Sequence, residues 1–172
     1  MNEVCTFSTI EDFWRYHNHI PKPSEIFFDG ETRKKVGPKS KSIVEYNLFK
    51  KGIQPEWSDP QNACGGSFYI RQTLDMTTLD MYWQNLVMGL VGEIVENSCD
   101  GTVDQSGAKN CICGARVVDK SRGMPIFRVE LWINTTDADV KERIKKNLVE
   151  CLIDGLGTSR KGFPRFDFKE HS

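Results

Sequence analysis

The chain has no long apolar run and little net charge. No part of the 172-residue sequence approaches the ~18 consecutive apolar residues of a membrane span. The N-terminal segment MNEVCTFSTIEDFW lacks the basic start and apolar run of a secretory signal. The formal net charge of −1 excludes long-range attraction of the whole molecule to nucleic acid, whereas the 23 lysines and arginines still allow a local basic pocket. The length suits one domain with a sizeable core.

Closely spaced cysteine pairs are also scarce. The six cysteines are Cys5, Cys64, Cys99, Cys111, Cys113 and Cys151, and none forms a C-x-x-C motif. In a strand, the close pair Cys111 and Cys113 would point to one face, but a zinc site there would need ligands from distant parts of the chain. Free thiols in a reducing compartment are the preferred interpretation.

The hydrophobic pattern predicts an α+β domain with a mainly antiparallel sheet. Ser8 begins an S-x-x-E capping box ahead of a helix over 9–19. Further helices are predicted over 77–96, capped by Thr77 or Thr78, and over 137–157. Strands are predicted over 66–74, 111–119 and 125–133, with FPRFDF as a possible last strand.

Residues 21–42 are predicted to form a long, mobile, basic loop. The segment holds three prolines, and five cations lie between Arg33 and Lys41. Two interpretations stay open: a solvated insertion, or an electrostatic arm that attracts phosphates.

The segment PIFRVELWI carries an unusual mixture on one strand face. Alternation places Phe127, Val129, Leu131 and Ile133 in the core, and Arg128, Glu130 and Trp132 on the other face. The Cα atoms of Arg128 and Trp132 would stand ~13 Å apart, a distance comparable to a nucleotide from base to distal phosphates. Lys120 and Arg122 add cations at the same end of the predicted hairpin.

A second tryptophan stands in a segment of turn formers, IQPEWSDPQNACGG. Trp57 and Trp132 could clamp a planar cation through stacking and cation–π attraction. Asp59 could accept two N–H donors from one edge of a guanine, while arginine and lysine neutralise phosphates. The alternative is that both tryptophans are amphipathic residues at a sheet edge.

Six ordered motifs resemble the eukaryotic translation initiation factor 4E family of mRNA 5′-cap-binding proteins. They are TIEDFWRYHNHI, YNLFKKGIQPEW, GGSFYI, LDMYWQNLVMGLVGE, CGARVV and VELW. The resemblance spans nearly the whole chain and implies one cap-binding domain over 1–172, with 21–42 as a basic insertion. The implied fold is a curved antiparallel β-sheet with three long helices packed on its convex face.

The resemblance also implies roles for single residues. Trp57 would be one side of a tryptophan sandwich around 7-methylguanine, and Trp132 would pack near its N7-methyl group. Lys120, Arg122 and Arg128 would bridge the phosphates. The family's guanine-edge glutamate is replaced by Ser58, so Asp59 would have to substitute for it.

The family's other sandwich tryptophan lies on a loop ahead of the first-helix motif, and this chain has no counterpart in that place. We expect either that residues are missing ahead of Met1 or that another aromatic side chain serves. The candidates are Phe27, Phe28 and Tyr46.

The convex face of the family binds partner proteins. Ile10 and Trp14 match its anchoring positions, and Met88 and Gly92 are compatible with them. Gln84 and Asn85 replace the usual leucine and glutamate, and such polar substitutions should weaken or redirect partner choice. The implied partners are a scaffold initiation factor 4G-like protein or 4E-binding proteins.

The leading hypothesis is a non-enzymatic, metal-free protein that binds capped mRNA in the cytoplasm, with some in the nucleus. The basic insertion and altered partner face resemble divergent isoforms such as those of trypanosomatid protozoa, which would imply a hypermethylated cap-4. One rival is a cap-binding-impaired isoform that acts as a translational regulator or interaction module. The other rival is a metal or thiol enzyme using Cys111 and Cys113. No nucleophile–base pair is evident: the three histidines, His17, His19 and His171, are scattered, and His17 is expected on the first helix.

Overall fold

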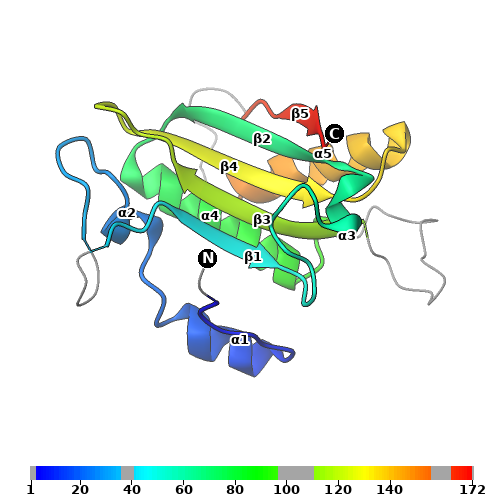
Figure 1. Cartoon of the computed structure of the whole chain (residues 1–172), viewed down its shortest axis with the longest axis horizontal. Helices are drawn as coiled ribbons and strands as arrows, with labels where there is room; N and C mark the ends of the chain where they lie inside the picture. Colours follow the sequence, from blue (N-terminus) through cyan, green and yellow to red (C-terminus); the bar gives the residue numbers. More distant parts are fainter. Residues whose placement is uncertain (1–2, 36–40, 97–110, 156–163, 172) are drawn as a thin grey trace.

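The computed structural model describes residues 3–35, 41–96, 111–155 and 164–171 and shows an open antiparallel sheet (Figure 1). Its five strands are β1 (Glu45–Phe49), β2 (Gly66–Thr73), β3 (Ile112–Asp119), β4 (Ile126–Ile133) and β5 (Asp167–Glu170). Their spatial order is β1-β3-β4-β2-β5, and every neighbouring pair is antiparallel. The strand β4 therefore lies in the centre of the sheet.

Helices cover one face of this sheet. The two long helices are α4 (Met76–Val91) and α5 (Ala138–Ile153), which lie behind the strands in Figure 1, and three shorter helices are α1 (Ile10–His17), α2 (Pro23–Ile26) and α3 (Pro60–Ala63). The expected fold class is confirmed, with 16 residues each in α4 and α5 and only 8 in α1. No helix in the described ranges has the length and apolar content of a membrane span.

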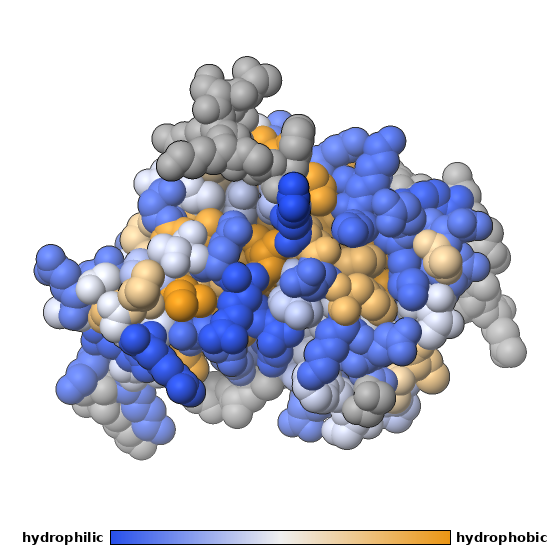
Figure 2. All heavy atoms as spheres, turned by 90° about the horizontal axis from the view of Figure 1, so that it is seen from above, coloured by the Kyte–Doolittle hydropathy of each residue, from blue (hydrophilic) through white to orange (hydrophobic). Residues whose placement is uncertain are grey.

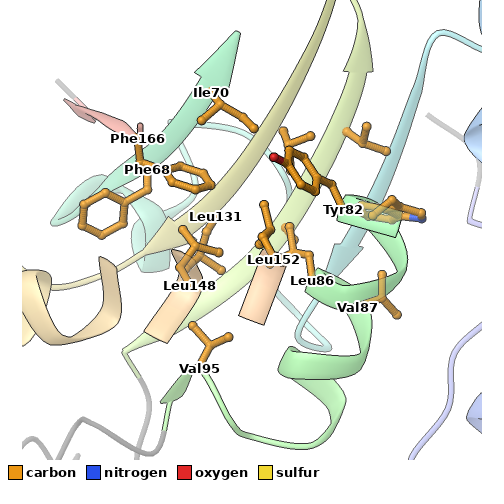
Figure 3. Packing of buried hydrophobic residues seen from close by; sticks show 14 of the residues in the cluster. Phe68, Ile70, Tyr82, Leu86, Val87, Val95, Leu131, Leu148, Leu152 and Phe166 are labelled. Atoms are coloured by element: carbon orange, nitrogen blue, oxygen red, sulfur yellow. The ribbon is translucent and has the colours of Figure 1, made fainter. Parts of the chain in front are cut away.

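The core lies between the sheet and the two long helices. Alternate residues of β4 supply its sheet side, and Phe127, Val129, Leu131 and Ile133 have no exposed surface. Figure 3 shows Leu131 of β4 and Phe68 of β2 packed toward Leu148 of α5. The residues that alternate with them, Arg128, Glu130 and Trp132, therefore lie on the opposite face of the sheet, which the two long helices do not cover. Seen from the β5 side, the surface is largely hydrophilic around a central apolar area (Figure 2).

Two of the predicted helix caps are wrong. The side chain of Thr9, not Ser8, accepts the backbone N–H of Asp12 at the start of α1. Asp75 caps α4 and accepts from Thr78, so neither Thr77 nor Thr78 is the cap. In both cases the true cap is an adjacent or nearby residue of the same favoured class, so residue type alone did not select between them.

The predicted basic loop is partly structured. It contains α2, and the N–H and hydroxyl of Ser24 donate to Asp80 on α4. Arg33 donates to the carbonyl of Ser121 (3.1 Å) and pairs with Asp119 (3.4 Å) at the β3–β4 turn. The description as a long mobile loop is therefore wrong for 21–35, while residues 36–40 lie outside the described part. The short elements β1 and α3 were not predicted.

Asn85 joins α4 to the end of α5. Its side-chain amide donates to the carbonyls of Leu152 (3.2 Å) and Asp154 (2.9 Å), which belong to the last turn and C-cap of α5. The last carbonyls of a helix have no partner within the helix, so this amide satisfies groups that otherwise need water. Asn85, predicted as a partner-binding residue, is thus engaged in helix packing, whereas the neighbouring Gln84 is exposed.

We expect Asn85→Ala to lower the free energy of unfolding by about 1–2 kcal/mol, because two carbonyl groups lose their donor. Urea denaturation measures the effect. Gln84→Ala is the matched control, and it should stay within about 0.5 kcal/mol of the wild type because the position is exposed. Equal losses in both variants would contradict the bridging role of Asn85.

Candidate functional site on the open face of the sheet

Side chains opposite the core form rows across the open face of the sheet. In one row, Trp132 of β4 lies between Gly114 of β3 and Ser67 of β2. In the next row, Glu130 lies between Arg116 and Tyr69. Directly opposite residues of antiparallel strands share a face, so this register brings residues from three strands together.

Glu130 is the centre of a buried ionic network. Its side chain has no exposed surface, and one oxygen accepts hydrogen bonds from Trp132 Nε1 (2.8 Å) and Arg116 Nε (2.8 Å). The other oxygen lies 2.6 Å from Arg128 Nε. A buried carboxylate is tolerated only when it is paired and hydrogen-bonded, so this residue fixes both arginines and the indole. The sequence placed Glu130 on the correct face but did not predict these contacts.

Trp132 forms the floor of the site. It is only 1% exposed, its ring meets Phe49 edge-on, and the Arg116 guanidinium lies 5.1 Å from its ring centroid. The ring of His171 covers it at a centroid distance of 4.4 Å. The alternative that Trp132 lies at a sheet edge is wrong, because β4 has β3 on one side and β2 on the other.

Trp57 is presented by a loop with its own internal support. The amide of Asn62, a residue with no exposed surface, donates to the carbonyls of Gln54 (2.6 Å) and Glu56 (2.9 Å). These bonds hold the chain on both sides of Pro55 and leave the indole of Trp57 43% exposed. A large, partly exposed aromatic ring on a braced loop is suited to stacking on a flat ligand.

The carboxylate of Asp59 takes part in the same loop. Its two oxygens accept the backbone N–H groups of Gln54 (2.8 Å) and Gln61 (2.8 Å), so Asp59 caps α3 and closes the turn. Ser58 is exposed. The predicted role of Asp59 as an acceptor for a guanine edge stays a prediction, and the structure adds a structural role to it.

Two site residues that the sequence did not indicate come from β5 and the position directly after it. Lys169 Nζ lies 3.9 Å from the ring centroid of Trp57, and His171 stacks on the same indole at 5.9 Å with 18° between the planes. His171 also contacts Trp132, so one imidazole joins the two tryptophans. No role for His171 was predicted from the sequence. The signal was their spacing: Lys169 and His171 stand two residues apart where β5 ends.

The cationic residues gather at the other end of the open face. The guanidinium of Arg128 lies 4.3 Å above the ring of Tyr69. Lys120 follows β3, where its N–H donates to the carbonyl of Ile126 (2.9 Å), and Arg122 is exposed in the β3–β4 turn. The structure thus places the three predicted phosphate ligands at one end of the central hairpin.

Two of the proposed replacements for a second stacking aromatic are wrong. Phe27 has no exposed surface and stacks on Phe127 in the core, and Tyr46 packs on Trp83 of α4. Both rings therefore lie on the helix side of the sheet, away from Trp57. Phe28 is half-buried, and its N–H donates to Asp119 beside the β3–β4 turn.

The cysteine pair does not offer reactive thiols. Cys111 and Cys113 are buried, and the thiol of Cys113 donates to the carbonyl of Gln61 (3.4 Å). Burial raises the pKa of Cys113 to about 12, which keeps this thiol protonated near neutral pH. Across the described ranges, no group of three or more His, Cys, Asp or Glu residues could hold a metal ion. Cys99 lies outside these ranges.

The predicted partner face is apolar and accessible. Ile10 is 50% and Trp14 is 38% exposed on α1. A cavity of about 290 Å³ lies between residues 7–10 and Val91 of α4, which connects the start of α1 with the α4 end that carries Met88 and Gly92. Gln84 lines a different cavity farther along α4. Of the predicted partner-binding residues, Ile10 therefore lies near the α4 end that carries Met88 and Gly92, whereas Gln84 lines a separate cavity.

We expect Glu130→Ala to lower the free energy of unfolding by about 3–5 kcal/mol, because it leaves two arginines and a buried indole N–H without their shared acceptor. Chemical denaturation measures the loss. The exposed Glu142 on α5 provides the control, since Glu142→Ala removes the same charge without burial. A loss similar to that control would mean that the network does not stabilise the fold.

Acidification should destabilise the protein through His171. Burial lowers the pKa of this imidazole below its ordinary value of 6.5. Its Nδ1 lies 3.0 Å from the carbonyl of Asn62, while Nε2 is buried without a partner, so protonation would add an unsatisfied donor. Below pH 6.5 the unfolded chain takes up a proton that the folded chain resists, and stability falls as the pH is lowered toward the folded pKa.

The free energy of unfolding, measured at intervals between about pH 5 and pH 7.5, tests this expectation. His171→Gln should show a shallower decline than the wild type. His19→Gln, at an exposed position, is the matched control for replacing a histidine. The same decline in wild type and His171→Gln would assign the pH dependence to other groups.

Comparison with known proteins identifies the family. The sequence profile described as "Eukaryotic initiation factor 4E" matches residues 1–172. The chain is 34% identical over 155 residues to eukaryotic translation initiation factor 4E-3 of Caenorhabditis elegans, which is 87% of this chain and 51% of that protein. It is 32% identical over 145 residues to factor 4E of Aplysia californica, covering 83% and 54%. The chain thus spans about half the length of these curated relatives.

Solved structures agree with this result. An Ascaris suum eIF4E-3 complex with an m2,2,7G cap superposes with a TM-score of 0.70 at 26% identity, covering 99% of this chain and 78% of that one. The complex of C. elegans eIF4E-3 with the 4E-binding protein Mextli and a cap analog gives a TM-score of 0.69 at 28% identity, covering 98% and 78%. The chain belongs to the eukaryotic initiation factor 4E family.

Proposed function

We propose that the open face binds the 7-methylguanosine cap of mRNA in translation initiation. The observation that carries the proposal is the contact of Trp57 with a cation: the Lys169 ammonium lies 3.9 Å from the ring centroid of a partly exposed indole. The face of the Trp57 indole already contacts a cation, so it suits the positively charged 7-methylguanine ring. This ring can also stack on the indole, which adds to the cation–π attraction. The Ascaris suum relative is described in complexes with m7G and m2,2,7G caps.

The arrangement of the open face fits the length of a capped nucleotide. The base end is formed by Trp57, His171 and Trp132. The ring of His171 contacts both tryptophans. Arg128 precedes Trp132 by four residues on β4. At a rise of ~3.3 Å per residue, the Cα atom of Arg128 at the phosphate end lies roughly 13 Å from that of Trp132. Lys120 and Arg122 supplement the positive charge there.

Within this proposal each residue has a defined task. The base replaces Lys169 on the indole of Trp57, and His171 lies beneath it, supported by the buried ring of Trp132. Arg128 binds the phosphates with the guanidinium N–H groups that Glu130 leaves available, while Ser58 and Asp59 lie on the loop that carries Trp57. The hypermethylated cap-4 expected for a trypanosomatid-type isoform stays a prediction.

The proposed activity is binding without catalysis, in the cytoplasm. The pKa of Cys113, raised by burial to about 12, is opposite to the requirement of a thiol nucleophile. The family is named for a translation initiation factor, which agrees with a binding role.

We further propose that the helical face binds a partner protein. The complexes of C. elegans eIF4E-3 contain the 4E-binding protein Mextli. In this chain the exposed Ile10 and Trp14 and the adjoining 290 Å³ cavity provide apolar contacts for a scaffold factor or a 4E-binding protein. Asn85 is not proposed as a main contact for the partner, because its side-chain amide donates to carbonyls at the end of α5.

Titration with 7-methyl-GTP and GTP, followed by tryptophan fluorescence, tests cap binding. We expect saturable quenching by 7-methyl-GTP, with an affinity at least about tenfold higher than for GTP, since one tenfold step corresponds to about 1.4 kcal/mol. Trp57→Ala should lose this selectivity, whereas Trp14→Ala, which removes a comparably exposed tryptophan from the helical face, should retain it.

Equal affinity of the wild type for the two nucleotides would overturn the cap proposal. If a 4E-binding peptide still bound under those conditions and Trp14→Ala abolished its binding, the chain would be an interaction module instead.

A further inference from the structure

Two arginines stand directly opposite each other on the open face. Arg71 of β2 is in register with Arg128 of β4, one row beyond the pair of Tyr69 and Glu130. Directly opposite side chains in an antiparallel pair have Cβ atoms ~4.5–5.5 Å apart, and like charges in that position destabilise the sheet. The placement therefore calls for an anion that the chain itself supplies or that a ligand brings.

Among the residues that the structure describes, an ion-pair partner is present for Arg128 and absent for Arg71. Arg128 pairs with Glu130 at 2.6 Å, and its guanidinium lies over the ring of Tyr69. Arg71 is exposed and has no ion pair, side-chain hydrogen bond or ring contact with any residue of the described ranges. Arg128 is thus held in place, while the Arg71 guanidinium keeps all of its donors available.

No carboxylate in the described residues forms an ion pair with Arg71. The buried Glu130 is already shared by Arg116 and Arg128. On β5, Asp167 lies opposite Tyr69, diagonal to Arg71, and forms no ion pair within the described residues. On the other side of β4, Lys120 adds a further exposed cation. The excess positive charge therefore extends over three adjacent strands, β3, β4 and β2.

We propose that Arg71 and Arg128 together bind one phosphate group of the ligand's polyphosphate chain. A phosphate offers several acceptor oxygens and negative charge, and guanidinium groups match it through paired N–H donors. Held between the two arginines, it converts their repulsion into attraction to a common anion. Arg71 is then a phosphate-binding residue of this site in addition to Lys120, Arg122 and Arg128. This inference rests on the proposed cap-binding function.

The test compares Arg71→Ala with Arg143→Ala. Arg143 is exposed on α5, on the opposite side of the sheet, so the control removes the same charge away from the site. The ligands are 7-methyl-GTP and the phosphate-free nucleoside 7-methylguanosine. Arg71→Ala should bind 7-methyl-GTP about tenfold more weakly and 7-methylguanosine as the wild type does, because only the phosphates contact Arg71. Arg71→Lys should recover part of the affinity, since it restores the charge without the guanidinium fork.

A double-mutant cycle with Arg128→Ala adds a second readout. If both arginines hold the same phosphate, the two losses are not additive. The effect of Arg71→Ala should also shrink as salt is raised, because an exposed charge is screened.

The outcomes separate the two proposals. Failure of the wild type to distinguish 7-methyl-GTP from GTP would overturn the cap proposal and this inference with it. Cap-selective binding by the wild type, with Arg71→Ala matching Arg143→Ala on 7-methyl-GTP, would overturn the inference alone. An equal loss for the nucleoside and 7-methyl-GTP would also overturn it, because the variant would then disturb the base end of the site.

Discussion

The carboxylate of Glu130 lies in the central strand without exposed surface, and its charge is balanced by Arg116 and Arg128. The same carboxylate accepts the indole N–H of Trp132. An ion in this position is costly unless it is paired with opposite charge, so the two arginines and the indole around it have little freedom. Glu130 therefore connects the tryptophan end of the open face with its cationic end through one buried group.

The base end is already occupied by the chain's own residues. Lys169 and His171 both contact Trp57, and His171 also contacts Trp132. A ligand that stacks on Trp57 therefore exchanges one cation–π contact for another, and the net gain is smaller than the gross attraction of the new pair. The added stacking area and the phosphate contacts must supply the difference, which makes the cationic end of the face important for affinity.

The sheet separates two surfaces that serve different purposes. On the helix side, apolar packing of β4 against α4 and α5 provides the core, and Asn85 fastens one long helix to the other. On the open side, the alternate residues of the same strand carry ions and an indole. A partner on α1 and α4 and a nucleotide on the open face thus contact different side chains of one sheet, with no shared residue between the two proposed surfaces.

The sequence by itself determined the features that depend on local pattern. The alternation in β4 placed Phe127 and Leu131 in the core and Arg128, Glu130 and Trp132 on the other face, and the turn formers around Trp57 indicated a loop. The family motifs indicated the fold. Only the tertiary structure decided which groups meet: His171 bonds to the carbonyl of Asn62, 109 positions away, and Arg116 reaches Glu130 from a neighbouring strand. For the same reason Phe27 turned out to be a core residue, and Tyr46 to pack against the core. Strand alternation is a property of adjacent residues, whereas strand order and register bring together residues far apart in the chain, and no local pattern encodes those contacts.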